Sequence, residues 1–220
     1  MSDIAAAVDE VRARIAAAAR SAGREPDAVR LVAATKTVPA DRVAEAVALG
    51  VRDVGENRAQ ELLAKADALT AAPAPAAIEV CWHFLGRLQR NKVRSLAGSV
   101  AWWQSVDREA LGVAIARHAP GARVLVEVNL GGEPQKGGCA PTEAGRLVDT
   151  LRELGLRVEG LMTIPRAGDD PRRWFAALRE LGDDLGVDQL SMGMTDDYET
   201  AVQEGATMVR VGRAIFGARR

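Results

Sequence analysis

Lys36 is the residue whose type and position most directly suggest chemistry. It lies near the end of residues 31–38, a run of small and apolar residues that is typical of a buried β-strand. Burial disfavours the charged form of an amine, so a buried lysine can act as a nucleophile near neutral pH. Such an amine forms a Schiff base with the carbonyl group of a substrate or a cofactor. The alternative is a lysine that projects past the strand and pairs with a carboxylate.

Two glycine-containing segments late in the chain could bind an anion. Residues 191–195 read Ser-Met-Gly-Met-Thr, and residues 210–214 read Arg-Val-Gly-Arg-Ala. Glycine allows backbone N–H groups to approach an anion, and hydroxyl and guanidinium groups add donors. Each segment alone is a weak signal, because a glycine at a strand end is often only a turn. Together with Lys36 they indicate a ligand with a phosphate at one end and a carbonyl at the other, a description that pyridoxal phosphate (PLP) fits.

Two further patterns are assigned no function. Cys81 and His83 are two residues apart and would face the same side of a strand, but two ligands without a further histidine or cysteine nearby do not make a zinc site. We therefore expect no metal. The loop at residues 131–138 contains Lys136 but lacks the spacing of a nucleotide-binding loop.

The bulk composition describes an ordinary globular protein. The chain has 220 residues, 48% of them hydrophobic and 27% charged, enough for one barrel-sized domain or two small ones. Its formal net charge of -1 gives no indication of binding to nucleic acid or to an anionic membrane. Two cysteines are too few for a disulfide framework. No apolar run is long enough to span a membrane and the N-terminus lacks a signal-peptide pattern, so we expect a cytoplasmic protein.

Strand and helix signals alternate along the chain. Runs of β-formers predict eight strands, at residues 31–38, 51–57, 80–86, 101–106, 123–130, 157–164, 189–195 and 207–216. Helical spacing predicts helices at residues 3–22, 41–49, 58–69, 88–96, 108–118, 141–154, 170–185 and 196–204. Strict alternation implies a parallel sheet, and eight repeats imply an α/β fold, a (β/α)8 TIM barrel with an extra N-terminal helix.

The barrel is expected to form a single domain over residues 1–220. Residues 70–77, rich in alanine and proline, form the one linker-like loop and are too few to mark a domain boundary. A doubly wound open sheet is the alternative fold, but no Gly-x-Gly-x-x-Gly follows the first strand. Trp102 and Trp103 are adjacent in a strand, so we expect one to face the barrel interior and the other to lie under a helix.

A barrel requires its functional side chains at the carboxyl ends of the strands. The residues that meet this condition are Lys36, Asn57, His83, Asn129, Met162, Thr163, Ser191 and Arg210. Barrels commonly bind phosphate through the loops after strands seven and eight, which is where the two glycine-containing segments lie.

Six segments of the sequence resemble one known family. They are residues 35–36, 55–61, 82–92, 160–165, 190–194 and 209–217. In this order, and over essentially the whole chain, they resemble the pyridoxal phosphate homeostasis protein family, which is related to the barrel domain of bacterial alanine racemase. The blocks Trp-His-Phe and Ser-Met-Gly-Met are quite specific to that family.

The resemblance implies a fold-type III barrel that holds PLP as a Schiff base on Lys36. It also implies phosphate contacts from Ser191 and from the backbone near Gly212, with Arg210 at the pyridine end of the cofactor. Arg213 departs from the family, which often has threonine or serine there, so a hydroxyl contact to phosphate is absent while the backbone N–H can still serve. The residues that the resemblance places around the cofactor cavity, with less defined roles, are Asn57, His83 and Met162.

The same resemblance implies a protein that buffers or delivers PLP without robust catalysis. PLP withdraws electrons most strongly when its pyridine nitrogen is protonated and paired with a carboxylate, whereas an arginine such as Arg210 can only donate. Racemase relatives take a second base from a tyrosine on a separate domain. The one tyrosine of this chain, Tyr198, falls in a predicted helix, where we expect a surface position. A site without a covering domain also suits transfer of the cofactor.

Two other functions stay open. One is a PLP-dependent amino-acid racemase, and the other is a Schiff-base aldolase in which Lys36 attacks a phosphorylated sugar. A barrel with a phosphate site fits an aldolase equally well, so only the motif match disfavours it. The expected partners are PLP and PLP-dependent apoenzymes, for a protein that acts as a monomer and binds neither nucleic acid nor membrane.

Overall fold

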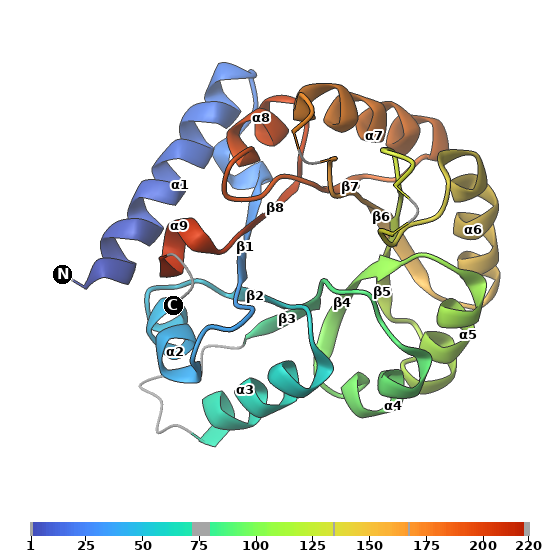
Figure 1. Cartoon of the computed structure of the whole chain (residues 1–220), viewed down its shortest axis with the longest axis horizontal. Helices are drawn as coiled ribbons and strands as arrows, with labels where there is room; N and C mark the ends of the chain where they lie inside the picture. The colour runs from blue at the N-terminus through green and yellow to red at the C-terminus, as the bar shows by residue number, and fades with distance from the viewer. Residues whose placement is uncertain (1, 72–79, 134, 167, 218–220) are drawn as a thin grey trace.

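Eight parallel strands close into a barrel in the order in which they occur along the chain. The computed structural model describes residues 2–71, 80–133, 135–166 and 168–217. The strands are β1 (Arg30–Ala34), β2 (Asp53–Glu56), β3 (Cys81–Phe84), β4 (Val100–Val106), β5 (Arg123–Glu127), β6 (Arg157–Met162), β7 (Gln189–Ser191) and β8 (Met208–Val211). Figure 1 shows them at the centre of the molecule with the helices in a ring outside. The (β/α)8 barrel predicted from the alternating pattern is confirmed.

A helical segment follows each of the eight strands, and one further helix and a short turn precede β1. The helices are α1 (Asp3–Ser21), α2 (Ala40–Ala48), α3 (Ala59–Ala71), α4 (Val93–Leu96), α5 (Glu109–His118), α6 (Pro141–Glu153), α7 (Pro171–Leu185), α8 (Tyr198–Gln203) and α9 (Arg213–Phe216), with short 3-10 turns η1 (Pro26–Ala28) and η2 (Arg90–Lys92). The extra N-terminal helix is α1, which packs beside α8 and α9. Among the described residues, no helix combines the length and apolarity that crossing a membrane requires.

Side chains alternate between two layers because successive residues of a strand point to opposite faces. An inner cluster fills part of the barrel and consists of Val32, Trp102, Leu125, Met162 and Met208. The larger core lies between the strands and the helices, and Trp103 belongs to it. The expectation that the adjacent tryptophans face opposite sides is therefore correct, with Trp102 inside.

Several strands end earlier than predicted, and their remaining residues form the loops at the carboxyl end. β1 ends at Ala34 rather than at residue 38, and β7 ends at Ser191 rather than at residue 195. The second half of the predicted last strand is wrong, because residues 213–216 form α9, in which the N–H of Phe216 donates to the Gly212 carbonyl at 3.0 Å. In the predicted loop at residues 70–77, the first two residues end α3 and the rest lie outside the described residues.

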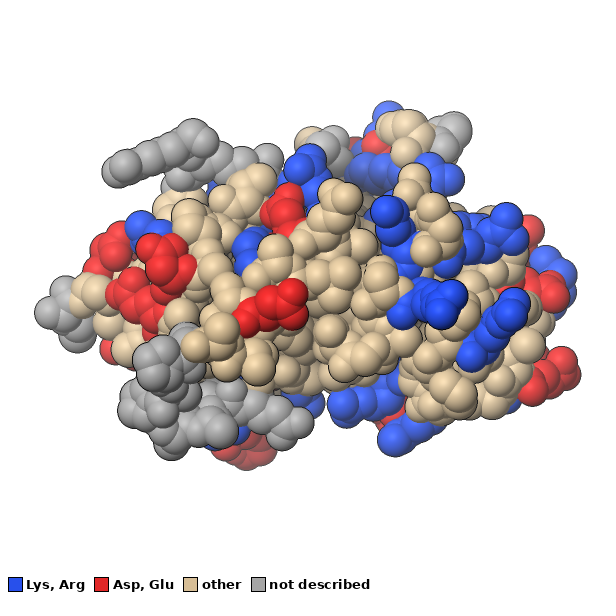
Figure 2. Space-filling model, turned by 90° about the horizontal axis from the view of Figure 1, so that it is seen from below, with Lys and Arg blue, Asp and Glu red and all other residues tan. Residues whose placement is uncertain are grey.

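The surface carries both signs of charge. Figure 2 shows Lys and Arg side chains predominating on one half of the visible face, while Asp and Glu gather toward the opposite end.

Candidate functional site

Lys36 lies at the end of the barrel formed by the carboxyl ends of the strands and the loops that follow them, which we call the mouth. The side chain is half-buried rather than buried as predicted, because β1 stops at Ala34 and residues 35–37 leave the sheet in a turn. Its amine makes no hydrogen bond or ion pair with the described part of the chain. The alternative interpretation of Lys36, in which its amine pairs with a carboxylate, therefore finds no such pair within those residues.

The turn that carries Lys36 rests on a buried ion pair. Lys65 of α3 pairs with Glu56 at the end of β2, and these two side chains are only 9% and 0% exposed. Lys65 Nζ also donates to the Thr35 carbonyl oxygen at 2.7 Å, and Thr35 Oγ1 donates to Glu56 Oε1 at 2.9 Å. A buried pair of charges is tolerated only in a well-bonded geometry, so these contacts fix the residue immediately before Lys36.

The residue immediately after Lys36 is held from the same helix. Thr37 has a φ of 65°, in the left-handed region that non-glycine residues seldom adopt. Its N–H donates to Glu61 Oε2 at 3.1 Å, and the same carboxylate lies 3.7 Å from Lys65 Nζ. Glu61 and Lys65 of α3 thus hold both neighbours of Lys36 in place.

Arg210 of β8 is a buried cation near the carboxyl ends of the neighbouring strands β6, β7 and β8. Its Nη1 donates to Ser191 Oγ at 2.7 Å and its Nη2 to the Thr163 carbonyl oxygen at 2.8 Å. Burial lowers the pKa of Arg210 to about 10, so the side chain remains charged at neutral pH. Arginine carries five N–H groups, which leaves three without a partner in the described chain.

A chain of hydrogen bonds runs from Arg210 across the barrel interior to Asp53, and we call these five residues the interior chain. Ser191 Oγ donates to Gln104 Oε1 at 2.6 Å, and Gln104 Nε2 lies 2.7 Å from His83 Nδ1. His83 Nε2 lies 2.8 Å from Asp53 Oδ1. Because Arg210 can only donate, each bond of the chain takes a defined direction, and it leaves His83 as a neutral imidazole with its proton on Nε2. Burial lowers the pKa of His83, in agreement with the neutral form.

The loops after β7 and β8 approach each other at the mouth. Gly193 has a φ of 88°, and a Cβ placed there would lie 2.5 Å from the Cβ of Ala201. The N–H of Arg210 donates to the Gly193 carbonyl at 3.0 Å. The Arg213 guanidinium pairs with Asp196 on the surface. The backbone of residues 212–214 therefore begins α9 close to the loop that contains Gly193.

The remaining predicted site residues fall into two groups. Asn57 is exposed beyond β2 at the mouth, where its N–H donates to Glu56 Oε2 at 3.0 Å. Met162 is fully buried in the inner cluster, and both ring nitrogens of His83 are used by the interior chain. The structure therefore brings Lys36, Asn57, Gly212 and Arg213 to the mouth, while Met162 and His83 lie within the barrel.

Glu127 is an inward-facing carboxylate at the end of β5 that was not singled out from the sequence. It is 7% exposed, and a Cβ placed on Gly137 would lie 3.1 Å from its Oε2. Burial, reinforced by the charge of Asp107, raises the pKa of Glu127 to about 7, although Arg210 opposes the shift. No hydrogen bond reaches its carboxylate from the residues that the structure describes.

Tyr198 is buried and not on the surface as predicted. It is 1% exposed, and the guanidinium of Arg14 lies 5.6 Å from the centre of its ring. The cause is α1, which covers α8 and could not be placed on that helix from local periodicity alone.

Comparison with known proteins agrees with this geometry. The family of alanine racemase N-terminal domains matches residues 7–220. The pyridoxal phosphate homeostasis protein of Pseudomonas aeruginosa is 44% identical over 229 residues, covering 100% of this chain and 97% of that protein. A structure of PipY from Synechococcus elongatus, described as having PLP bound, is 33% identical with a TM-score of 0.83 and covers 97% of this chain and 100% of its own.

A second solved structure shows a similar match. It is described as an unknown protein from Bifidobacterium adolescentis, and it is 40% identical with a TM-score of 0.87, covering 97% of this chain and 94% of its own. Identity and coverage of this extent relate the chain to these proteins over its whole length. The chain belongs to the pyridoxal phosphate homeostasis protein family, within the wider group of alanine racemase N-terminal domains.

Proposed function

We propose that this protein binds PLP at the mouth of the barrel and serves PLP homeostasis by buffering or delivering it. The observation that carries the proposal is a set of polar groups without partners in the described chain: the Lys36 amine, three N–H groups of Arg210 and the Glu127 carboxylate. Buried or half-buried polar groups are normally satisfied, so an unpaired set at one opening indicates a polar ligand. The names of the P. aeruginosa relative and of the PLP-bound PipY structure support PLP as that ligand.

The residues at the mouth fit the parts of this cofactor. The Lys36 amine would condense with the aldehyde, releasing water and forming a Schiff base. Arg210 would donate to the pyridine nitrogen with one of its free N–H groups. The phosphate would be held by the backbone N–H groups of Gly212 and Arg213. A contact from Ser191 requires its hydroxyl to leave Gln104, so we assign that side chain to orienting Arg210.

The same groups favour a carrier over an amino-acid racemase. When bound, PLP supplies an electron sink, which is strongest with a protonated pyridine nitrogen. Arg210 cannot accept that proton, so it favours the unprotonated ring. Racemisation also needs a second base, and the ring of Tyr198 is buried beside Arg14 of α1. We therefore propose a protein without robust turnover, acting as a monomer in the cytoplasm, a reducing compartment in which its two free cysteines would persist.

The test is covalent trapping of the cofactor. We expect the purified protein to show the visible absorption of a PLP Schiff base, and borohydride followed by peptide mass analysis to locate the label on Lys36. Lys36→Ala should lose the band and the label, while Lys92→Ala, a lysine of η2, should keep both. An unchanged spectrum and label in Lys36→Ala would remove the central claim.

Carrier and racemase are separated by two further measurements. The loaded protein should restore activity to a PLP-free apoenzyme faster than its spontaneous release of PLP allows. It should show no racemisation or other turnover with a panel of amino acids. Turnover that is abolished by Lys36→Ala would instead support the enzyme.

A further inference from the structure

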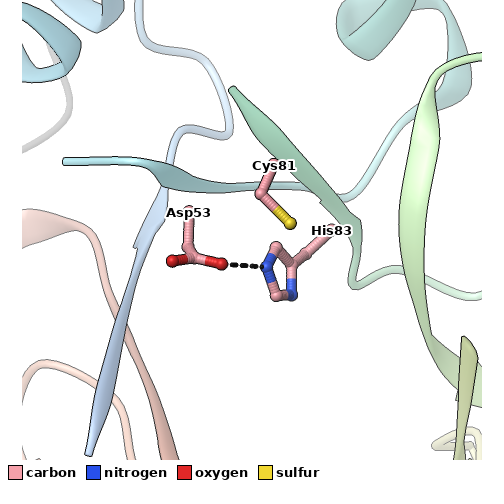
Figure 3. A group of neighbouring side chains, drawn as sticks. All are labelled: Asp53, Cys81 and His83. Carbon is pink, nitrogen blue, oxygen red and sulfur yellow. Dashed lines mark hydrogen bonds and ion pairs between the residues drawn. The ribbon is translucent and has the colours of Figure 1, made fainter. Parts of the chain in front are cut away.

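Asp53, Cys81 and His83 form a compact group of potential metal ligands at the amino end of the barrel. Their ligand atoms all lie within 4.8 Å of one another. Figure 3 shows the Asp53 carboxylate, the Cys81 sulfur and the edge of the His83 ring converging from two neighbouring strands. The pairing of β2 with β3 places Asp53 directly opposite Cys81, and Cys81 and His83 share one face of β3.

We propose that Asp53, Cys81 and His83 bind a zinc ion through a carboxylate oxygen, the thiolate sulfur and the imidazole Nε2, with water at a fourth position. Zinc is four-coordinate and accepts this mixture of ligands, whereas calcium and magnesium select oxygen and disfavour thiolate. The sequence predicted no metal because Cys81 and His83 had no third ligand nearby. The third ligand is Asp53, which lies 28 residues before Cys81 in the sequence and on the adjacent strand.

Binding would exchange protons for the metal in a balanced way. The Cys81 thiol would lose its proton to solvent and bind as the thiolate. The proton on His83 Nε2 would leave while Nδ1 takes one up, so the imidazole stays neutral. Zinc with one thiolate and one carboxylate then forms a site of no net charge.

The surroundings already supply partners for two of the ligands. Arg30 Nη1 donates to Asp53 Oδ1 at 2.9 Å, and Gln104 contacts His83 Nδ1 at 2.7 Å. A histidine that binds metal through Nε2 usually donates its other N–H to an oxygen. A half-turn of the Gln104 amide would place Oε1 against His83 Nδ1 and turn Nε2 toward the Ser191 hydroxyl, which can accept.

The site can be reached from solvent. A groove of about 400 Å³ opens between α1, β1 and β2, and Asp53 and Arg30 are among its lining residues. Cys81 is itself partly exposed. The nearby positive charges are Arg30 and Arg123, the second of which stacks on Trp102 with its guanidinium 4.6 Å from the ring centre. Both arginines repel any cation, so binding depends on the anionic thiolate and carboxylate, and the thiolate favours zinc over ions that select oxygen.

Cobalt(II) provides the test because it reports thiolate ligation and geometry by absorption. Adding Co²⁺ to the full-length, chelator-treated protein should produce a thiolate charge-transfer band and the strong visible bands of tetrahedral cobalt, saturating at one equivalent. One equivalent of Zn²⁺ should abolish them. The Lys36→Ala protein should behave identically, which separates this site from the PLP proposal and removes PLP absorption.

Matched variants assign the ligands. Cys81→Ser should lose the charge-transfer band and bind Zn²⁺ at least about 100-fold more weakly, whereas Cys139→Ala, at the other thiol, should keep both. Asp53→Asn preserves the shape of the side chain but removes an anionic ligand. Since loss of an outer-shell partner already costs about 10–100-fold in metal affinity, Zn²⁺ binding should weaken by at least about tenfold. Absence of the cobalt bands from the folded wild-type protein, or their persistence in Cys81→Ser, would overturn the assignment.

Discussion

The mouth and the interior chain lie in the same barrel but differ in whether their polar side chains have hydrogen-bond partners. From Arg210 to Asp53, each side chain of the interior chain is hydrogen-bonded to the next. At the mouth, the Lys36 amine and the Glu127 carboxylate have no such partner within the described residues. The difference indicates that folding completes the interior chain from Ser191 to Asp53. The mouth, together with the three free N–H groups of Arg210, is completed by a ligand.

The two regions also differ in what holds them. The interior chain is built on inward positions of strands, where the barrel fixes each side chain directly. Lys36 stands on a turn outside the sheet, and it depends on contacts from α3 to Thr35 and Thr37. A functional side chain on a loop therefore requires its own supporting polar groups, and here these are buried.

The strongest test of this comparison removes the support beneath the mouth. Lys65→Met leaves Glu56 buried without its cationic partner and releases the Thr35 carbonyl. Breaking a buried pair from one side typically costs about 3–5 kcal/mol, and we expect a loss of that size in the free energy of unfolding measured with urea. In the protein that remains folded, PLP should attach to Lys36 more slowly.

The other member of the buried pair, Glu56, provides the control for the Lys65→Met variant. Adding Glu56→Gln to Lys65→Met removes the uncompensated carboxylate, so the double variant should recover a substantial part of the lost stability. The rate of PLP attachment should stay low, because the Thr35 carbonyl still lacks its donor. Strictly additive losses in stability would show that the two side chains act independently.

The interior chain should respond to loss of its central member. Gln104→Leu removes the acceptor of Ser191 and the donor to His83 Nδ1, leaving two buried groups without partners. Each unsatisfied buried group costs about 1–3 kcal/mol, and burial of the added apolar side chain offsets part of the sum, so we expect a net loss of about 2–4 kcal/mol in urea unfolding. Gln60→Leu, on the exposed side of α3, should change stability little. A Gln104→Leu protein as stable as wild type would show that the chain has no energetic role.

Much of the barrel follows from the sequence, because alternation of apolar strands with helices survives small errors in their ends. Lys36 and the glycine-containing segments could be placed at the mouth for the same reason. The ends of the strands could not be predicted from the sequence, since the turn at Thr37 and the start of α9 depend on contacts with other elements. Tyr198 illustrates the limit, as its burial comes from a helix at the other end of the sequence.

The residues missed from the sequence are those whose partners lie on another element. Lys65 follows Leu62 by three residues, so its place on the inward face of α3 was a usable signal that a buried cation needs an anion. Gln104 follows the inward Trp102 by two residues and could have been placed inside by alternation. Asp53 could be joined to Cys81 and His83 only through the register of β2 with β3, which the sequence does not specify.

The smallest expected change in the free energy of unfolding comes from a residue of the mouth, Glu127. It is a gain in stability, whereas the preceding variants lose stability. Because the pKa of Glu127 is raised to about 7 in the folded protein from an ordinary value of 4.5, the folded state holds this proton more tightly than the unfolded state. Its contribution favours folding below about pH 4.5 and is lost as the pH rises through 7. Glu127→Gln should therefore stabilise the PLP-free protein at pH 8, by about 1–3 kcal/mol.

The pH dependence makes this prediction specific. At pH 5 the stability difference between variant and wild type should be much smaller than at pH 8, because Glu127 is then mostly protonated in the folded wild type. What remains is the cost of protonating a carboxylate that is largely ionised in the unfolded chain. Glu153→Gln, at an exposed position of α6, should show no such difference between pH 5 and pH 8. A Glu127→Gln protein less stable than wild type at pH 8 would mean that the carboxylate is satisfied in the folded state, and the contrast between the mouth and the interior chain would fail at this residue.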